Sequence, residues 1–269
     1  MIVRPLAWGL LLVLIGCASP ANKLDRRAQT LGFSVAAVQG DGFLHRVYIS
    51  GDIDSAKRVH IYLDGDGRPW LWQRQAADDP TPSSTLVLEL MSQDSTASIY
   101  LGRPCYFVLE RCDDRLWTTA RYSPQVVKSM TAAVQQLLRH NDQASISLVG
   151  YSGGGALATL MVADLPAVDE VVTVAANLDI DYWVALHGYA PLDDSFNPIE
   201  SANLAGVRHW HWVGGRDEEV RPEMVRRFVE RHGGTLREIN DFDHRCCWAD
   251  QWAELLAVSL GAVSGPSAR

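Results

Sequence analysis

Short apolar segments alternate with segments of helical periodicity along most of the chain. Apolar side chains recur every three or four positions in 124–138, 224–229 and 248–256, while 156–163 is apolar all round, as expected for helices that cover a core. This alternation predicts an α/β fold with a mostly parallel sheet and helices on both faces. The segments expected as strands are 33–38, 43–49, 59–63, 98–101, 146–149, 171–175, 207–213 and 236–239.

Residues 1–16 combine one cation, Arg4, with an apolar run at 6–15. A run of this length is typical of a secretory signal peptide and is shorter than the ~20 residues that a membrane-spanning helix needs. It ends in the sequence LIGC at 14–17, which resembles the lipobox of bacterial lipoproteins. The resemblance implies cleavage before Cys17 and attachment of acyl chains such as palmitate to that cysteine. Two or more chains anchor a protein stably to a membrane.

Ala18 follows the cysteine, where an Asp would favour retention in the inner membrane. By the same resemblance, we expect an outer-membrane lipoprotein that faces the periplasm. The alternative is a plain secretory signal, which would leave a soluble periplasmic or secreted protein.

The chain is expected to hold one folded domain between two polar ends. The predicted parts are a signal peptide at 1–16, a lipidated N-terminus and polar tether at 17–30, the domain at 31–260 and a flexible tail at 261–269. No internal repeat interrupts this organisation. The segment 178–203 is irregular and aromatic-rich, and it is too short for a lid domain.

Composition narrows the classes of partner. Apolar residues make up 47% and charged residues 21%, which allows a large core without a disulfide framework. The formal net charge is −8 and no run of Lys or Arg occurs, so neither a nucleic-acid surface nor a polybasic lipid-binding patch is expected. Membrane attachment is expected only through Cys17.

The sequence GYSGG at 150–154 fits the pattern G-x-S-x-G, with Ser152 as the candidate nucleophile. It lies between an expected strand and an expected helix, which is the setting that the motif requires. Glycines leave room around a sharp turn that raises the serine above the sheet, and the helix N-terminus favours developing negative charge. Here the chain resembles the α/β-hydrolase family, over roughly residues 43–256.

In that family a serine, an acid and a histidine follow one another along the chain, and the resemblance points to Ser152, Asp217 and His244. His244 comes after the last expected strand and is the predicted general base. Asp217 follows the strand at 207–213 and is the predicted orienting acid. Asp179 and Asp181 follow the preceding strand and remain alternatives for the acid.

The tetrahedral intermediate of acyl transfer needs two backbone donors. One is expected from the N–H of Gly153 and the other, by resemblance, from the N–H of Asp66 in the loop DGDG at 64–67. Asp64 stands where many relatives carry His, and we expect it to bind backbone N–H groups of the loop. Trp70 and Trp72 follow and are candidates for an acyl-pocket wall, and Trp183 is a candidate for a small lid.

Four cysteines remain besides Cys17, and they allow three disulfide connectivities. A local bridge between Cys105 and Cys112 is favoured, which leaves Cys246 and Cys247 as a vicinal disulfide or as free thiols. No C-x-x-C occurs, and the pair His209 and His211 lacks partners for a metal site. We therefore expect no metal and no cofactor.

These features predict a serine hydrolase of the esterase or lipase kind, acting on a small-molecule or lipid ester. A peptidase or acyltransferase would use the same three residues, because the triad only attacks a carbonyl. The alternative from another class is a non-catalytic envelope lipoprotein that keeps the fold for binding. Complete occupancy of the triad positions counts against it.

Overall fold

The computed structural model describes residues 19–260 apart from 73 and 109–111. Its centre is an eight-stranded sheet in the order β1-β2-β6-β3-β7-β8-β9-β10. The pairs β1–β2 and β2–β6 are antiparallel, and the pairs from β6 to β10 are parallel. The strands are β1 (Ser34–Gln39), β2 (Leu44–Ser50), β3 (Arg58–Leu63), β6 (Ser98–Leu101), β7 (Ser145–Tyr151), β8 (Val168–Val174), β9 (Arg208–Gly214) and β10 (Thr235–Ile239).

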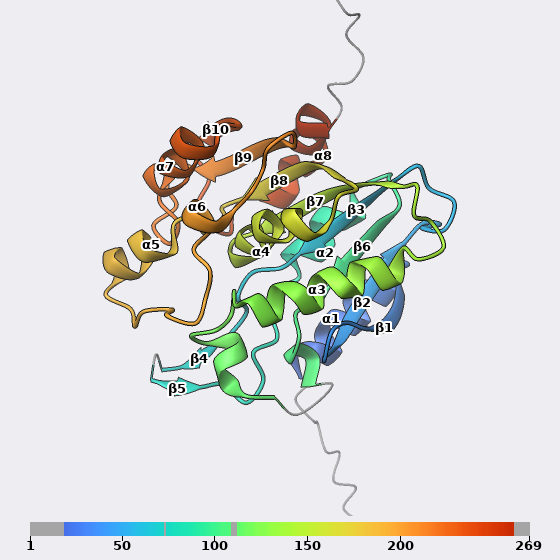
Figure 1. Ribbon diagram of the computed structural model, residues 1–269, viewed down its shortest axis with the longest axis horizontal. Helices are drawn as coiled ribbons and strands as arrows, with labels where there is room; N and C mark the ends of the chain where they lie inside the picture. The colour runs from blue at the N-terminus through green and yellow to red at the C-terminus, as the bar shows by residue number, and fades with distance from the viewer. Residues whose placement is uncertain (1–18, 73, 109–111, 261–269) are drawn as a thin grey trace, which may run out of the picture.

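Helices cover both faces of the sheet, as the periodicity predicts. On one face α3 contacts α4, α4 contacts α6, and α6 contacts α7. Figure 1 shows α3 and α4 in front of the sheet. On the other face α2 contacts α8. The bounds are α2 (Leu86–Ser92), α3 (Pro124–Leu137), α4 (Gly153–Met161), α5 (Ile180–His187), α6 (Pro198–Ser201), α7 (Pro222–His232) and α8 (Trp248–Leu260).

The expected tether at 17–30 is wrong over most of its length. Residues Pro20–Thr30 form helix α1, whose N-cap Ser19 accepts a hydrogen bond from the N–H of Asn22. Leu24 and Ala28 are fully buried and make a narrow apolar stripe, while Arg27 binds Glu89 of α2. The charged residues around this stripe hid its helical spacing. Cys17, the expected signal peptide and the expected tail at 261–269 lie outside the described residues.

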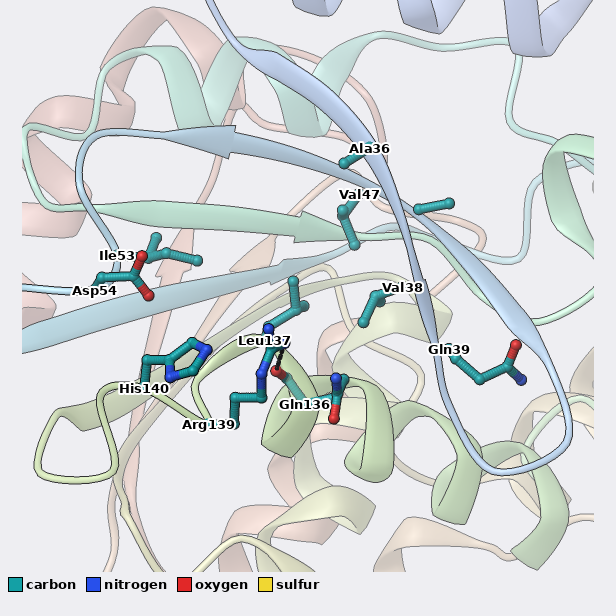
Figure 2. A pocket seen from close by; sticks show the side chains of 11 residues that line it. Ala36, Val38, Gln39, Val47, Ile53, Asp54, Gln136, Leu137, Arg139 and His140 are labelled. Atoms are coloured by element: carbon teal, nitrogen blue, oxygen red, sulfur yellow. Dashed lines mark hydrogen bonds between the residues drawn. The ribbon is translucent and has the colours of Figure 1, made fainter.

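A hollow of about 350 Å³ lies between β1 and the end of α3 (Figure 2). Ala36 and Val38 border it from the strand, and Leu137 and His140 border it from the helix side. A second hollow of about 900 Å³ lies further along α3, beside Lys128 and Phe196. Neither is lined by Ser152, Asp217 or His244.

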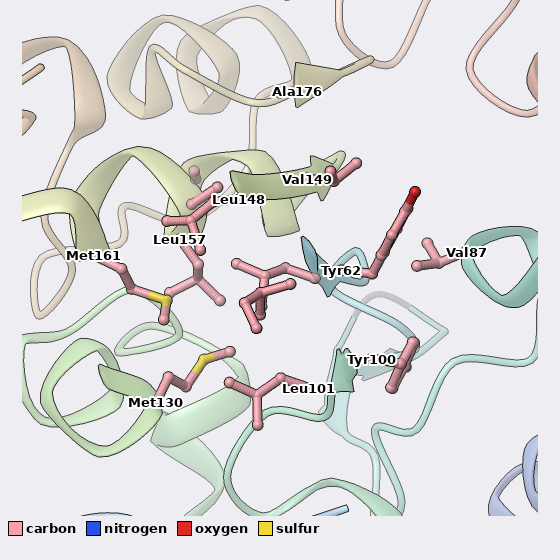
Figure 3. Packing of buried hydrophobic residues seen from close by; sticks show 14 of the residues in the cluster. Tyr62, Val87, Tyr100, Leu101, Met130, Leu148, Val149, Leu157, Met161 and Ala176 are labelled. Atoms are coloured by element: carbon pink, nitrogen blue, oxygen red, sulfur yellow. The ribbon is translucent and has the colours of Figure 1, made fainter. Parts of the chain in front are cut away.

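The core fills both faces of the sheet around β3 and β7. Figure 3 shows Met130 of α3 packed near Leu157 and Met161 of α4, with Tyr62 and Val87 toward α2. These side chains are at most 1% exposed. Dense packing of this kind holds the carboxyl ends of the parallel strands in fixed register, and loops at those ends can therefore carry a site. No helix in residues 19–260 is long and apolar enough to cross a membrane.

Candidate active site

Ser152 lies on the sharp turn between β7 and α4, as the motif predicts. Its φ of 52° falls in the left-handed region, which a residue with a side chain adopts at a cost of about 1–3 kcal/mol. The turn closes only because its neighbours lack side chains: a Cβ at Gly150 would strike the carbonyl of Gly154, and one at Gly154 would strike the carbonyl of Leu63. The strained turn presents the hydroxyl of Ser152 above the carboxyl edge of the sheet.

His244 and Asp217 complete a chain of hydrogen bonds that begins at Ser152. The Ser152 Oγ lies 3.1 Å from His244 Nε2, and His244 Nδ1 lies 2.8 Å from Asp217 Oδ2. With the proton on Nδ1, the imidazole donates to the buried carboxylate and accepts from the serine hydroxyl. The backbone N–H groups of Glu219 and Val220 donate to the other oxygen of Asp217, at 2.9 and 2.7 Å. The carboxylate is therefore held on both of its oxygens.

The loop that carries His244 is fixed from several sides. The Tyr151 hydroxyl donates to the carbonyl of His244 at 2.9 Å, and the two rings lie 5.3 Å apart. The Asp243 carboxylate accepts the N–H groups of Cys246 and Arg245, which lower the pKa of Asp243. Cys246 and Cys247 form a vicinal disulfide across a cis peptide bond. The other disulfide joins Cys105 and Cys112, and a 3-10 turn at Tyr106–Val108 follows Cys105.

The alternative acids lie elsewhere and have partners of their own. Asp179 caps α5 by accepting the N–H of Tyr182, and it binds Arg227 at 2.8 Å. Asp181 accepts a hydrogen bond from the side chain of Asn197 at 3.0 Å. Neither carboxylate bonds His244, so the structure brings only Asp217 to the histidine.

The pair His209 and His211 is buried, and its ring nitrogens Nδ1 and Nε2 face each other at 2.9 Å. His211 Nδ1 also lies 2.8 Å from the hydroxyl of Thr173. Burial, followed by the neighbouring histidines, lowers the pKa of His211 to about 3, which keeps the ring neutral. Within the described part of the chain, no three His, Cys, Asp or Glu side chains are grouped so as to hold a metal ion.

The loop at 64–67 lies directly over the nucleophile. A Cβ at Gly65 would come within 3.2 Å of the Ser152 Cβ. The Asp64 carboxylate accepts the N–H of Gly65 at 2.7 Å, the backbone contact that the sequence predicts, and burial raises the pKa of Asp64 to about 6. The N–H of Asp66 has no acceptor among the described residues, and the N–H of Gly153 is the first of α4 and has none within the helix. These two N–H groups are the donors that the sequence predicts for the oxyanion.

Sequence reasoning missed the side chains that surround Asp66. Its carboxylate contacts Arg103, Arg121 and Tyr122, and its carbonyl accepts the Tyr106 hydroxyl at 2.8 Å. Arg103 comes just after β6, and Arg121 and Tyr122 come just before α3. No local motif marks these positions, because only the fold brings the two segments to the loop.

The tryptophans that the sequence suggests for a pocket wall and a lid differ in their exposure. Trp70 and Trp72 lie on or beside the two-stranded ribbon of β4 (Trp70–Leu71) and β5 (Gln75–Ala76), and Trp72 is 83% exposed. Trp183 is buried in α5, where its ring lies 4.9 Å from that of Tyr189, and it forms no lid. The segment 178–203 contains the helices α5 and α6 rather than being irregular throughout.

Comparison with known proteins supports the hydrolase fold. A family model for class 3 lipases matches residues 91–176, a third of the chain that includes Ser152 but neither Asp217 nor His244. A search of curated proteins found no match.

Three solved structures illustrate the fold-level similarity. An esterase from Pyrococcus furiosus is 16% identical, with 87% of this chain and 92% of the esterase covered and a TM-score of 0.63. An α/β serine hydrolase without lid from Xanthomonas campestris is 13% identical, with 87% and 97% covered and a TM-score of 0.58. A proline iminopeptidase-related protein from Thermus thermophilus is 13% identical, with 86% and 98% covered and a TM-score of 0.62. The chain therefore has the α/β-hydrolase fold, and its described residues include no lid domain.

Proposed function

We propose that this chain, with its α/β-hydrolase fold, is a serine hydrolase that cleaves carboxylic esters through an acyl-enzyme on Ser152. The observation that carries the proposal is the chain of hydrogen bonds from Ser152 through His244 to Asp217, located at a strained turn. A nucleophile, a base and an orienting acid in this geometry are what acyl transfer requires.

The reaction follows from the contacts of each group. His244 Nε2 takes the proton of Ser152 Oγ as that oxygen attacks the ester carbonyl, and Asp217 stabilises the imidazolium that forms. The carbonyl oxygen becomes an oxyanion and accepts the N–H groups of Asp66 and Gly153. The intermediate collapses, and His244 returns the proton to the departing alcohol. Water, activated by His244, then hydrolyses the acyl-enzyme and restores the Ser152 hydroxyl.

An ester is the favoured substrate class. The match to class 3 lipases and the similarity to an esterase support it, although a peptidase-related protein shares the same fold. A peptidase or an acyltransferase is therefore the alternative on the same triad. A lidless site beside an exposed ribbon with Trp72 suits esters that reach the enzyme from bulk solvent or from a lipid surface.

A non-catalytic binding protein is the alternative from another class. It has no need of a strained Ser152, and strain of this kind persists only where the surrounding structure enforces it. The N–H groups of Glu219 and Val220 likewise hold Asp217 Oδ1, which leaves Oδ2 facing His244. Both features favour the enzyme.

The test uses a fluorophosphonate probe, which reacts with activated serines. We expect covalent labelling and ester hydrolysis by the wild-type chain, and neither by Ser152→Ala with the fold intact by circular dichroism. Ser92→Ala is the matched control, because Ser92 lies on α2 away from the triad. Full labelling of Ser152→Ala would remove the nucleophile assignment. A series of acyl esters and amides assayed in parallel separates esterase from peptidase.

Lipidation of Cys17 and an outer-membrane location facing the periplasm are part of the same proposal, supported by the sequence at 14–17. Growth with a fatty-acid analogue should label the wild-type protein, and Cys17→Ser should abolish that label and stop maturation. Equal labelling of the two proteins would leave an ordinary secreted enzyme.

A further inference from the structure

The side chain of Asp66 is the centre of a buried ionic cluster beside the candidate oxyanion hole. Arg103 Nη1 lies 2.8 Å from Asp66 Oδ1, and Arg121 Nη1 donates to Oδ2 at 2.9 Å. The Tyr122 hydroxyl lies 2.7 Å from both carboxylate oxygens. One carboxylate thus binds two guanidinium groups and a phenol.

Both arginines are almost completely enclosed, with side chains 4% exposed. Arg103 lies over the rings of Tyr106 and Tyr122, with its Cζ 5.7 and 5.6 Å from their centroids, and Arg121 donates through Nε to the carbonyl of Thr118 at 2.7 Å. Enclosing two cations is costly, and their contacts with Asp66 offset that cost. Burial raises the pKa of Asp66, but Arg103 and Arg121 outweigh it and hold the pKa below its ordinary value. The carboxylate is therefore ionised.

The cluster also lies against Gly153, whose N–H is the other candidate donor. A Cβ at Gly153 would collide with Asp66 Oδ1, and it would lie 2.5 Å from the Tyr122 hydroxyl. An uncompensated carboxylate so close to Gly153 would repel the negative charge that develops on the substrate oxygen. The two guanidinium groups neutralise the carboxylate and so remove this repulsion. Their ion pairs with the carboxylate also hold the loop at 64–67 in place.

The same residues tie down the backbone of the loop. Arg103 Nη2 donates to the carbonyl of Asp64 at 3.3 Å, and the Tyr106 hydroxyl donates to the carbonyl of Asp66 at 2.8 Å. The loop is thus held on both sides of the peptide that presents the Asp66 N–H. An error of about 1 Å in such a group costs on the order of 100-fold in rate.

We propose that Arg103 and Arg121 are positioning residues for the oxyanion hole, which fix the Asp66 N–H through its side chain and neutralise the carboxylate beside Gly153. The inference rests on the proposed serine hydrolase reaction. Neither arginine touches the substrate, and each acts through Asp66.

Asp64 makes the charge balance sensitive to a single change. It lies on the same loop and accepts a hydrogen bond from the Tyr100 hydroxyl at 3.1 Å. With a pKa of about 6, its carboxyl group is mostly ionised at neutral pH. Two cations then face two carboxylates. Loss of one arginine leaves a net negative charge beside the oxyanion, whereas replacement by lysine retains the balance.

The decisive variants are Arg121→Met, which removes the charge but keeps the apolar stem, and Arg121→Lys, which keeps the charge. We expect Arg121→Met to lower kcat about 10- to 100-fold on a soluble short-chain ester, with KM within about twofold. The inhibition constant of a boronic acid, which forms a tetrahedral anion on the serine, should rise by the same factor. Arg121→Lys should recover most of both losses.

Arg58→Met is the matched control. Arg58 also joins two carboxylates, Asp169 and Glu170, but at the other end of the sheet. It should lose stability without a change in kcat or boronate affinity. Where Arg121→Met fails to fold, Tyr122→Phe removes only the hydroxyl contact with Asp66 and should lower kcat about 3- to 10-fold with unchanged KM.

Several results would overturn the inference: full kcat and boronate affinity in Arg121→Met, equal kcat losses in Arg58→Met and Arg121→Met, or no rescue by lysine. These outcomes are distinct from failure of the proposed function. If the wild type hydrolyses no ester and Ser152 takes up no fluorophosphonate, the reaction itself is wrong. If Ser152 is labelled and Arg121→Met behaves as the wild type, only the role of the arginines is wrong.

Discussion

Two clusters of arginines and carboxylates lie at opposite ends of β3 and differ in what they hold. At the carboxyl end Arg103 and Arg121 enclose Asp66. At the amino end Arg58, the first residue of the strand, binds Asp169 at 2.6 Å and Glu170 at 3.0 Å. Arg208 of β9 binds the same Glu170.

The amino-end cluster joins strands to strands, and its arginine side chains are 29% and 46% exposed. The carboxyl-end cluster is enclosed, and it joins the body of the fold to a loop that no strand ladder fixes. The comparison teaches that the same residue types serve stability where they bridge ordered elements, and serve the site where they hold a loop in place.

The largest effect is expected from Asp217, at the carboxyl end of the parallel strands, and it tests whether this end of the sheet is the catalytic one. Asp217→Asn should lower kcat by about 10³- to 10⁴-fold, because the amide holds the imidazole in the wrong tautomer. Steady-state hydrolysis of a soluble ester measures it, with Asp179→Asn as the control that leaves His244 untouched. An active Asp217→Asn beside an inactive Asp179→Asn or Asp181→Asn would move the acid to the earlier strand.

A smaller effect sharpens the link between the enclosed cluster and the donor at Gly153. In Gly153→Ala the new Cβ meets Asp66 Oδ1, so the loop must move and kcat should fall by about 100-fold. Gly206→Ala is the control: nothing lies within 4 Å of its Cβ, and its positive φ of 81° costs stability alone. An unchanged kcat in Gly153→Ala would show that the loop at 64–67 can move away from the new Cβ without loss of activity, which would contradict the prediction.

The amino-end cluster is expected to matter for stability only. Arg58→Met leaves the buried Glu170 with one arginine, so the free energy of unfolding should fall by about 2–3 kcal/mol in a urea titration. The kcat of the folded fraction should match that of the wild type. A lower kcat in this variant would erase the distinction between the two clusters.

The smallest effect concerns pH. His45, at the carboxyl end, is fully buried between the Gly102 carbonyl and the Ser129 hydroxyl, and burial lowers its pKa to about 4. The unfolded chain, with a histidine pKa of about 6.5, binds more protons between these values. Stability is therefore lost as the pH falls below 6.5, by about 1–2 kcal/mol at pH 5.

His45→Gln should flatten this part of the pH dependence, measured as unfolding free energy between pH 7 and pH 5. The same change at the exposed His140 is the control and should leave the profile as in the wild type. An unchanged profile in His45→Gln would assign the acid sensitivity to other buried groups such as His211.

The fold and the three residues Ser152, Asp217 and His244 could be predicted because each carries a local signal: a glycine turn after a strand, or a position after a strand end. The structure joins the three residues by hydrogen bonds, while their catalytic roles stay predictions. Arg103 and Arg121 carry no such signal, since their partner lies 37 and 55 residues away along the chain. Contacts of that kind are set by topology and not by neighbouring sequence.

Helix α1 was missed for a different reason. Its apolar stripe is narrow, so the surrounding charges dominate its average polarity, and only packing against β1 reveals which face is buried. The exposure of Trp72 was not foreseen either, because the sequence does not show whether a large apolar side chain near a site is enclosed.

If Cys17 carries the proposed lipid, the position of α1 limits how far the folded domain can stand from the membrane. The first described residue, Ser19, caps α1 and stands two residues after Cys17, a separation of at most about 7 Å of extended chain. If Cys17 is lipidated as proposed, the folded domain lies close to the bilayer surface and not at the end of a long flexible tether. The domain then diffuses almost entirely along the membrane surface. The concentration of substrate at that surface, rather than in the bulk, sets the rate at which the domain encounters its substrate.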